Sequence, residues 1–279
     1  MKYASDFRQI ARDALRGNWS GAILTGFVAS LLGASLWGGG GSSGSSASNS
    51  GSAGDLFRNI DSATLDLIVS VLLVVGSILV IWGIVTLVIG GAAKLGYAIY
   101  NLNLVDGKEA RFSDLFSQFG RIGSGFIMNL LMGVFIFLWS LLFVIPGIIK
   151  SYSYAMTPFI LAEHPEISEN EAITRSRHLM DGNKLRLFCL MLSFIGWELL
   201  FCVPFLVSVV LLASKFAIGV HVALTGTIIF CGISFVLLFV GQLFLVPYQH
   251  AALAAFYRDI SAEYDRCDHS GSVLPGEVI

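Results

Sequence analysis

The sequence predicts an all-α, polytopic membrane helix bundle with six transmembrane helices. Of its residues, 55% are hydrophobic and only 13% are charged, and the mean hydropathy is +0.77. About a quarter of the residues in an average soluble domain are charged. Several apolar runs also exceed the roughly 18 to 20 residues that cross about 30 Å of hydrocarbon, and they lack the polar faces of helices on a soluble core.

The six expected spans and their orientation follow from the apolar runs and from the charges between them. The spans are residues 19–37, 65–93, 123–145, 146–162, 185–213 and 219–246. Most Lys and Arg residues lie in segments on the side of the N-terminus, whereas Arg58, Lys150 and Lys215 fall on or near the other side. Because cytoplasmic segments are enriched in Lys and Arg, we expect both termini in the cytoplasm.

An amphipathic helix is expected before the first span. In FRQIARDAL, apolar residues recur at the spacing of one helical face, and Arg8, Arg12 and Arg16 line a flank at i, i+4 spacing. This pattern is typical of a helix that lies in the membrane interface with its basic side toward the headgroups. After the first span, a Gly/Ser-rich stretch predicts a flexible extracytoplasmic loop over residues 38–64.

Two later segments repeat the amphipathic pattern. RFSDLFSQF, before the third span, has Phe112, Leu115, Phe116 and Phe119 as its apolar stripe. The segment 167–184, before the fifth span, carries a predicted capping box and a glycine that would end the helix. Ser168 and Glu171 form the expected capping box, and Gly182 is the glycine that would release the chain. The face expected to pack on the spans consists of Ala172, Ile173, Ser176, Leu179 and Met180, and the residues expected to face water are Glu169, Arg175, Arg177 and His178.

The repeated unit is therefore an interfacial amphipathic helix followed by a transmembrane hairpin. Three units are expected, at about residues 1–104, 108–163 and 167–257. Together they form one membrane domain over residues 1–260, and residues 261–279 are expected to be a flexible cytoplasmic tail.

Polar side chains inside the expected spans are the candidate functional residues. Glu198 falls near the middle of the fifth span, where a charge costs roughly 2.5 to 3.5 kcal/mol on insertion scales. Asn129 and Gln242 are milder cases, and Lys150 is a possible partner of Glu198. Glu198 can serve as a hydrogen-bonded carboxyl between helices, or as a site that couples protons or substrate.

The sequence has none of the common catalytic or phosphate-binding motifs, and it has no basic domain for nucleic acid. Glu163, His164 and Glu166 cluster after the fourth span, but Pro165 interrupts a spacing that fits no standard zinc set. We expect no enzymatic activity, no metal, no cofactor and no nucleic-acid partner.

Several stretches resemble a known family: RDALRGNW, FSDLF, VIPGIIKSYSYAMTP, SENEAITRSRHLMDGN and PYQHAALAAFY. Together they resemble the bacterial integral-membrane family called domain of unknown function 975. More distantly, they are similar to the membrane domain fused to some glycerophosphodiester phosphodiesterases. The resemblance implies a six-span bundle in the bacterial plasma membrane, and it supplies no activity and no catalytic residues.

Two functions remain open at this stage. The first is a non-enzymatic membrane protein that organises the membrane or serves as an accessory, binding lipid or partner proteins through the interfacial helices. The alternative is a small permease or transporter subunit that uses Glu198. An intramembrane enzyme would need a second titratable group beside Glu198, for which Lys150 and His221 are the choices.

Overall fold

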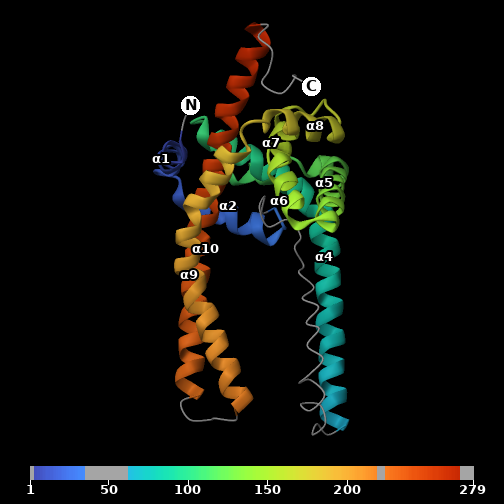
Figure 1. Cartoon of the computed structure of the whole chain (residues 1–279), viewed down its shortest axis with the longest axis vertical. Coiled ribbons are helices and arrows are strands. Elements are labelled where there is room, and N and C mark those ends of the chain that lie inside the picture. The colour runs from blue at the N-terminus through green and yellow to red at the C-terminus, as the bar shows by residue number, and fades with distance from the viewer. Residues whose placement is uncertain (1–2, 35–61, 219–223, 271–279) are drawn as a thin grey trace.

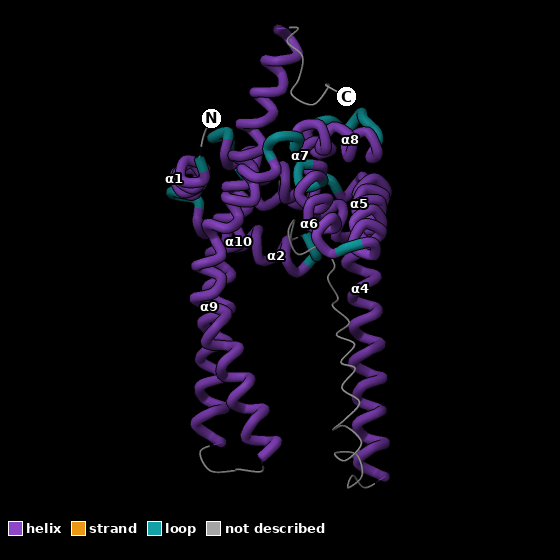
Figure 2. Tube along the Cα trace, in the orientation of Figure 1, coloured by secondary structure: helices purple, strands orange, loops and turns teal. Residues whose placement is uncertain are grey.

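The structure is a computed structural model that describes residues 3–34, 62–218 and 224–270. These residues form helices joined by short loops, without a strand among them (Figure 2). The helices are α1 (Ala4–Leu15), α2 (Trp19–Leu31), α4 (Ser62–Val105), η1 (Phe112–Phe116), η2 (Phe119–Arg121), α5 (Ile122–Leu142), α6 (Val144–Ser153), α7 (Thr157–Glu163), α8 (Glu169–Leu179), α9 (Lys184–Ile218) and α10 (Leu224–Ser270).

Among the described residues, four helical segments are long and apolar enough to cross a membrane. They are Val69–Val105, Phe112–Leu142, Lys184–Ser214 and Thr225–Arg266. The first expected span contains α2, which has 13 residues. At about 1.5 Å per residue this helix is shorter than the hydrocarbon core. The all-helical class is confirmed, and the long helices are compatible with a membrane protein.

The expected span 146–162 is not one helix. It is divided into α6 and α7, with Tyr154 to Met156 between them. Pro158 lies in the first turn of α7, where its missing N–H and fixed φ favour a helix start over the continuation of α6. The prediction of a continuous helix was wrong here because the apolar run continues across the break, and only Pro158 indicates that a new helix starts.

One end of the molecule is a packed layer, which we call the cap. It comprises α1, the α4 residues 90–105, α7, α8 and the α10 residues 245–260, and it forms the upper part of Figure 1. Phe7 of α1 meets Phe256 of α10 edge to face, and Phe159 of α7 stacks on Tyr257. All four side chains are buried.

Three stretches of helix extend away from the cap, and we call them the legs. They are the α4 residues 69–88, the α9 residues 195–214 and the α10 residues 225–240. In Figure 1 the α9 and α10 legs run side by side, whereas the α4 leg stands apart from them. Large apolar side chains along the legs are exposed, including Val74, Ile78 and Ile81 of α4.

Glycines permit close helix contacts within the α4 part of the cap. A Cβ on Gly91 of α4 would lie 2.0 Å from the Gly125 carbonyl oxygen of α5. A Cβ on Gly96 would lie equally close, at 2.0 Å, to the Leu115 carbonyl oxygen of η1. Small residues let helix backbones approach in this way, and they fix where α4 crosses its neighbours.

Two corners of the chain have the same geometry. Gly17, between α1 and α2, has φ +85°, and Gly182, between α8 and α9, has φ +74°. Only glycine adopts this region without steric cost. Asn18 donates its backbone N–H to the Leu15 carbonyl at 3.0 Å, and Asn183 donates to the Met180 carbonyl at 3.2 Å. The two helices therefore end in the same way.

The segment before the third span differs from the expectation. FSDLF forms the 3-10 turn η1, and η2 follows it, instead of an α-helix with an apolar stripe. Leu115 is buried, but Phe112 and Phe116 are exposed and pack edge to face on each other. In so short a segment, the spacing of apolar residues cannot distinguish a 3-10 turn from a helix.

The α8 helix agrees with the sequence. The Ser168 hydroxyl accepts a hydrogen bond from the Glu171 backbone N–H at 3.3 Å. The inner face is buried and consists of Ala172, Ile173, Ser176, Leu179 and Met180. Of the charged residues, Arg177 and His178 are exposed, and Glu169 and Arg175 are half-buried.

Both predicted flexible segments are only partly described. The loop expected at 38–64 lies outside the described residues except from Ser62 onward, where α4 begins. The tail expected from residue 261 is helical as far as Ser270, because α10 continues beyond the cap.

Candidate functional site

Glu198 of α9 is held by two glutamines of α10. The Gln242 amide donates to Glu198 Oε2 at 2.6 Å, and the Gln249 amide donates to Glu198 Oε1 at 2.9 Å. Gln242 and Gln249 are seven residues apart, so they lie on one helical face two turns from each other. Each carboxylate oxygen therefore has its own donor.

Lys150 is not the partner of Glu198, so that prediction was wrong. The Lys150 ammonium lies 4.8 Å from the centroid of the Trp139 ring of α5. Lys150 also lies one turn before Tyr154, whose N–H donates to the Lys150 carbonyl at 3.1 Å. The pairing with glutamines 44 and 51 residues away could not be read from local spacing.

Asn129 of α5 belongs to a separate polar contact. Its Oδ1 accepts a hydrogen bond of 2.7 Å from the ammonium of Lys94, which is only 6% exposed. The contact lies one turn beyond the crossing at Gly91 and Gly125, so it joins α4 to α5. We interpret Asn129 as a residue that satisfies a buried cation.

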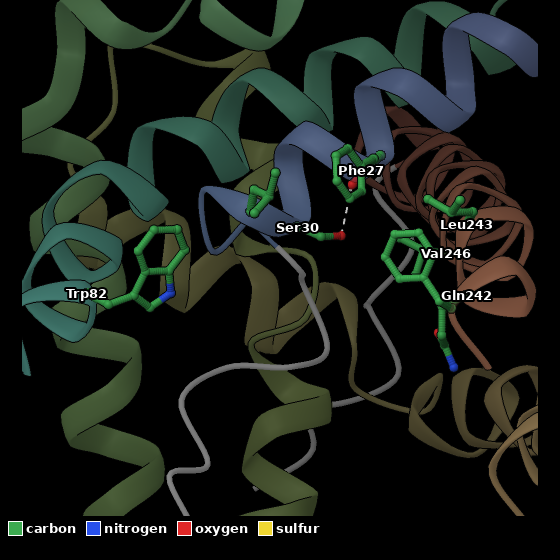
Figure 3. Close-up of a pocket in the computed structure, with 9 residues that line it drawn as sticks. Phe27, Ser30, Trp82, Gln242, Leu243 and Val246 are labelled. Carbon is green, nitrogen blue, oxygen red and sulfur yellow. Dashed lines mark hydrogen bonds between the residues drawn. The ribbon is translucent and has the colours of Figure 1, made fainter. Parts of the chain in front are cut away.

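A cavity of about 280 Å³ lies between α2, α4 and α10 (Figure 3). In Figure 3, Phe27 and Ser30 come from α2, Trp82 stands on the α4 side, and Gln242, Leu243 and Val246 line the α10 side. The remaining lining residues are Gly26, Leu31 and Phe239. The walls are mainly apolar and carry no charged side chain, which is typical of a site for a hydrophobic ligand.

Gln242 connects the cavity to the carboxylate. It lines the cavity and also donates to Glu198, which is itself not among the lining residues. The Ser30 hydroxyl donates to the Gly26 carbonyl of its own helix at 2.8 Å. The cavity therefore offers one side-chain amide and a mostly hydrocarbon surface.

A polar network in the cap was missed by the sequence interpretation. Arg258 of α10 donates twice to Asp106 at the end of α4, at 2.8 Å and 2.6 Å, and it also pairs with Glu163 of α7. The Tyr257 hydroxyl donates to Glu163 Oε2 at 2.7 Å. Asp106 and Arg258 are 152 residues apart, so no local motif predicts the network.

A second arginine of the cap joins α9 to α10. Arg186 pairs with Asp259 at 2.7 Å and with Glu263 at 3.6 Å, and it donates to Asn183 Oδ1 at 2.8 Å. Its guanidinium lies 5.7 Å from the centroid of the Phe256 ring. The start of α9 is thereby fixed against the far end of α10.

Glu163, His164 and Glu166, which cluster at the end of α7, each have a polar partner. Glu163 belongs to the Arg258 network, while His164 Nδ1 and Glu166 Oε1 lie 3.1 Å apart. A hydrogen bond from its own backbone N–H and the His164 ring hold the pKa of Glu166 below its usual range. Within residues 3–34, 62–218 and 224–270, no group of three or more His, Cys, Asp or Glu could hold a metal ion.

The basic residues of α1 and α8 differ in exposure. Arg12 and Arg16 are exposed on α1, opposite the buried Phe7, Ala11 and Leu15, and Arg8 is half-buried. The Arg8 carbonyl accepts from the Tyr248 hydroxyl at 3.2 Å, which ties α1 to α10.

The family is decided by comparison with known proteins. A family model described as protein of unknown function (DUF975) matches residues 1–151 and 141–264. The chain belongs to this family. No curated protein and no solved structure matches it. Since DUF975 has no assigned function, a functional proposal has to rest on the geometry of the described residues.

Proposed function

We propose that this DUF975 protein is a six-span protein of the bacterial plasma membrane with both termini in the cytoplasm. In this proposal it is not an enzyme, and it acts as an organising or accessory protein that binds lipid or partner proteins. The distant similarity to the membrane domain of glycerophosphodiester phosphodiesterases stays a prediction and contributes no activity.

The α4 leg is the observation that carries the proposal. Between Val69 and Val88, large apolar side chains are exposed on every face of the helix, including Leu73, Val80, Ile84 and others around the turn. A helix that is apolar all round is stable only in hydrocarbon or against another protein. The leg therefore offers a long surface for lipid or for a membrane-embedded partner.

Three excursions from the cap support the six-span arrangement. The chain leaves the cap after α1 and returns through α4. It leaves again through α5 and returns through α6 and α7. It leaves a third time through α9 and returns through α10. Asp106, Glu163 and Arg258 close the ends of these excursions in one network.

The cap also supports a common side for the two termini. The α1 helix packs on α10 through Phe7 and Phe256, so the first and the last described helices meet in the same layer. With its exposed Arg12 and Arg16, α1 has the charge bias of a cytoplasmic segment.

A permease is the alternative, and Gln242 is the observation that favours it. This residue joins a cavity wall to Glu198, the only acidic side chain among the described residues between Lys184 and Leu245. Against this alternative, both carboxylate oxygens of Glu198 already accept hydrogen bonds, and the cavity walls are mostly apolar.

Site-specific photo-crosslinking in cells tests the proposal. A photoreactive side chain is placed in turn at Val74, Ile78 and Ile81 on the α4 leg, and at the buried Leu95 as the matched control. The proposal predicts adducts with lipid or with a defined protein at the leg positions and none at Leu95. If the leg positions crosslink to other parts of this same chain, the leg is not a free surface and the proposal fails.

Glu198→Gln separates the two functions. In vesicles that contain the purified protein and a trapped pH dye, the permease alternative predicts proton movement that the variant abolishes. The organising role predicts no such movement in either protein, together with unchanged crosslinks on the leg.

A further inference from the structure

Helix α2 connects α10 to α4 directly below the cap. Near its start, the Trp19 ring centroid lies 5.9 Å from that of Phe244 in α10. Just after its end, a Cβ on Gly33 would lie 3.0 Å from the Cβ of Thr86 in α4. Figure 1 shows α2 lying between the α10 and α4 legs at their cap end. The cavity of Figure 3 lies at this place, with walls from all three helices.

The cavity is continuous with the apolar surface of the legs. Phe27 of α2 meets Phe239 of the α10 leg edge to face, with 6.0 Å between the ring centroids. Trp82, on the opposite side, belongs to the α4 leg. Phe27, Phe239 and Trp82 are 37%, 45% and 50% exposed. In the proposed membrane location, the exposed side of the cavity therefore faces lipid chains and not water.

Gln242 supplies a hydrogen-bonding group in this apolar wall. One N–H of its side-chain amide donates to Glu198 Oε2 at 2.6 Å. An amide has a second N–H and a carbonyl oxygen, so Gln242 can still donate to a ligand hydroxyl and accept from it. The Ser30 hydroxyl donates to the Gly26 carbonyl, and its oxygen can accept one more hydrogen bond. The cavity is therefore suited to a ligand that is mainly hydrocarbon and carries a hydroxyl group.

The charges around the cavity disfavour an ionic headgroup. None of the lining residues is charged, so a phosphate would find no cation there. Behind Gln242, Glu198 accepts a hydrogen bond on each oxygen, as a carboxylate does. A phosphate in the cavity would be an unpaired charge in apolar surroundings beside another acidic group, which is costly. An uncharged headgroup avoids this cost.

The size of the cavity restricts the ligand further. Its volume of about 280 Å³ is roughly nine times the volume that one water molecule occupies in the liquid. A methylene group is of similar size, so the cavity accommodates part of one acyl chain and its polar end. The rest of a lipid would lie along the exposed apolar faces of the legs.

We propose that this cavity binds an uncharged lipid with a free hydroxyl group, as in diacylglycerol. The hydroxyl bonds to the Gln242 amide, and one acyl chain lies between Phe27, Trp82 and Phe239. The inference rests on the proposed function, since it requires legs that lie in hydrocarbon, and it names the lipid class that the protein selects.

Photo-crosslinking of the purified full chain in detergent tests the site. The probe is 1,2-dioleoylglycerol with a diazirine in one acyl chain, and labelled peptides are identified by mass spectrometry. Labels are expected within residues 26–31 and 239–246. Unlabelled 1,2-dioleoylglycerol should halve the labelling at a concentration about three- to tenfold lower than its 3-acetyl derivative, which lacks the hydroxyl. Dioleoylphosphatidylglycerol should compete still less. This comparison uses the wild-type chain and does not depend on the folding of any variant.

A pair of glutamine variants tests the hydrogen bond. Gln242→Leu removes a donor of Glu198 and also the polar group of the cavity wall. Gln249→Leu removes the other donor of Glu198 but lies outside the cavity lining, so it is the matched control. Gln242→Leu should weaken competition by unlabelled dioleoylglycerol about three- to tenfold. Gln249→Leu should leave it at the wild-type value.

A pair of serine variants tests the cavity itself. Ser30→Phe places a large side chain on the lining and should lower labelling about tenfold or more, because the ligand would have to displace it. Ser20→Phe adds the same side chain at an exposed position of α2 that does not line the cavity. It should label like the wild type.

Each outcome decides the inference. Equal competition by dioleoylphosphatidylglycerol or by the acetyl derivative would overturn the selection of an uncharged hydroxyl lipid. An equal loss in both glutamine variants would show that the effect passes through Glu198 and would overturn the assigned hydrogen bond. Labels that spread along the legs and ignore Ser30→Phe would overturn the site, although lipid would still cover the legs and the proposed function would stand. The proposed function fails instead if Val74, Ile78 and Ile81 crosslink only to this same chain.

Discussion

The cap and the α4 leg belong in part to the same helix, yet they bury their side chains in opposite ways. From Gly90 to Asn101, α4 is buried almost continuously, and its Lys94 donates a hydrogen bond to Asn129 of α5. From Val69 to Val88, the same helix exposes large apolar side chains on every face. The two halves are therefore stabilised by different surroundings.

This difference shows which part of the chain specifies the arrangement of the helices. In the cap, close backbone crossings and paired charges fix one arrangement of helices. The legs need only apolar surroundings, which either hydrocarbon or a partner protein can supply. Substitutions should therefore have large effects on unfolding in the cap and small effects in the legs.

Gly91→Leu should have the largest effect. The new side chain would meet the Gly125 backbone, 2.0 Å from its Cβ, and neither helix can move without breaking the α4–α5 crossing. We expect a loss of about 3 kcal/mol or more in the free energy of unfolding. Tryptophan fluorescence during denaturation in detergent measures it. Gly83→Leu, in the leg and with no atom within 4 Å of its Cβ, is the control and should unfold like the wild type.

Leu95→Ala and Ile81→Ala compare the two halves of α4 directly. Leu95 is 0% exposed and Ile81 is 62% exposed. Removing the buried side chain leaves a cavity and should cost about 2 to 5 kcal/mol. Removing the exposed one should change the free energy of unfolding in detergent by less than about 0.5 kcal/mol. Equal losses for the two variants would contradict the division into cap and leg.

Arg258→Gln should lower stability by about 2 kcal/mol, because Asp106 and Glu163 would lose their shared cation while remaining partly buried. The value is below that of a fully buried pair because all three side chains keep some solvent contact. Thermal unfolding in detergent measures the change. Arg111→Gln, which breaks the exposed pair with Glu109, is the control and should have almost no effect.

Ser176→Ala should lower stability by about 1 kcal/mol, since it leaves the buried Ser153 carbonyl without its donor. Thr174→Ala removes an exposed hydroxyl that bonds within α8 and is the matched control. The two unfolding midpoints in detergent should differ in this order. A midpoint for Ser176→Ala equal to that of its control would show that α8 is not held on α6 by this bond.

Much of the architecture could be predicted from local signals in the sequence. Apolar length predicted the four long helices, Gly182 predicted the corner after α8, and Ser168 predicted the start of α8. These features depend on residues close together in the chain. They are therefore visible as spacing and residue type.

The partners of the polar residues could not be predicted in this way. Glu198 meets glutamines on another helix, and Arg258 meets Asp106 from the far side of the sequence. Such pairs depend on how the helices pack, and many pairings of opposite charge are compatible with one pattern of spans.

Labelling of single cysteines with a membrane-impermeant thiol reagent tests the central proposal most directly. The native cysteines are replaced, and one cysteine is introduced at Arg16, Lys108, Glu166 or Phe143 of the chain in intact cells. The first three lie in the loops that follow α1, α4 and α7, and Phe143 lies between α5 and α6, at the opposite end of α5 from η2. The account predicts labelling at Phe143 from outside and protection of the three cap positions until the cells are opened. Labelling of any cap position from outside, or protection of Phe143 together with them, would contradict three hairpins that begin and end on the cytoplasmic side.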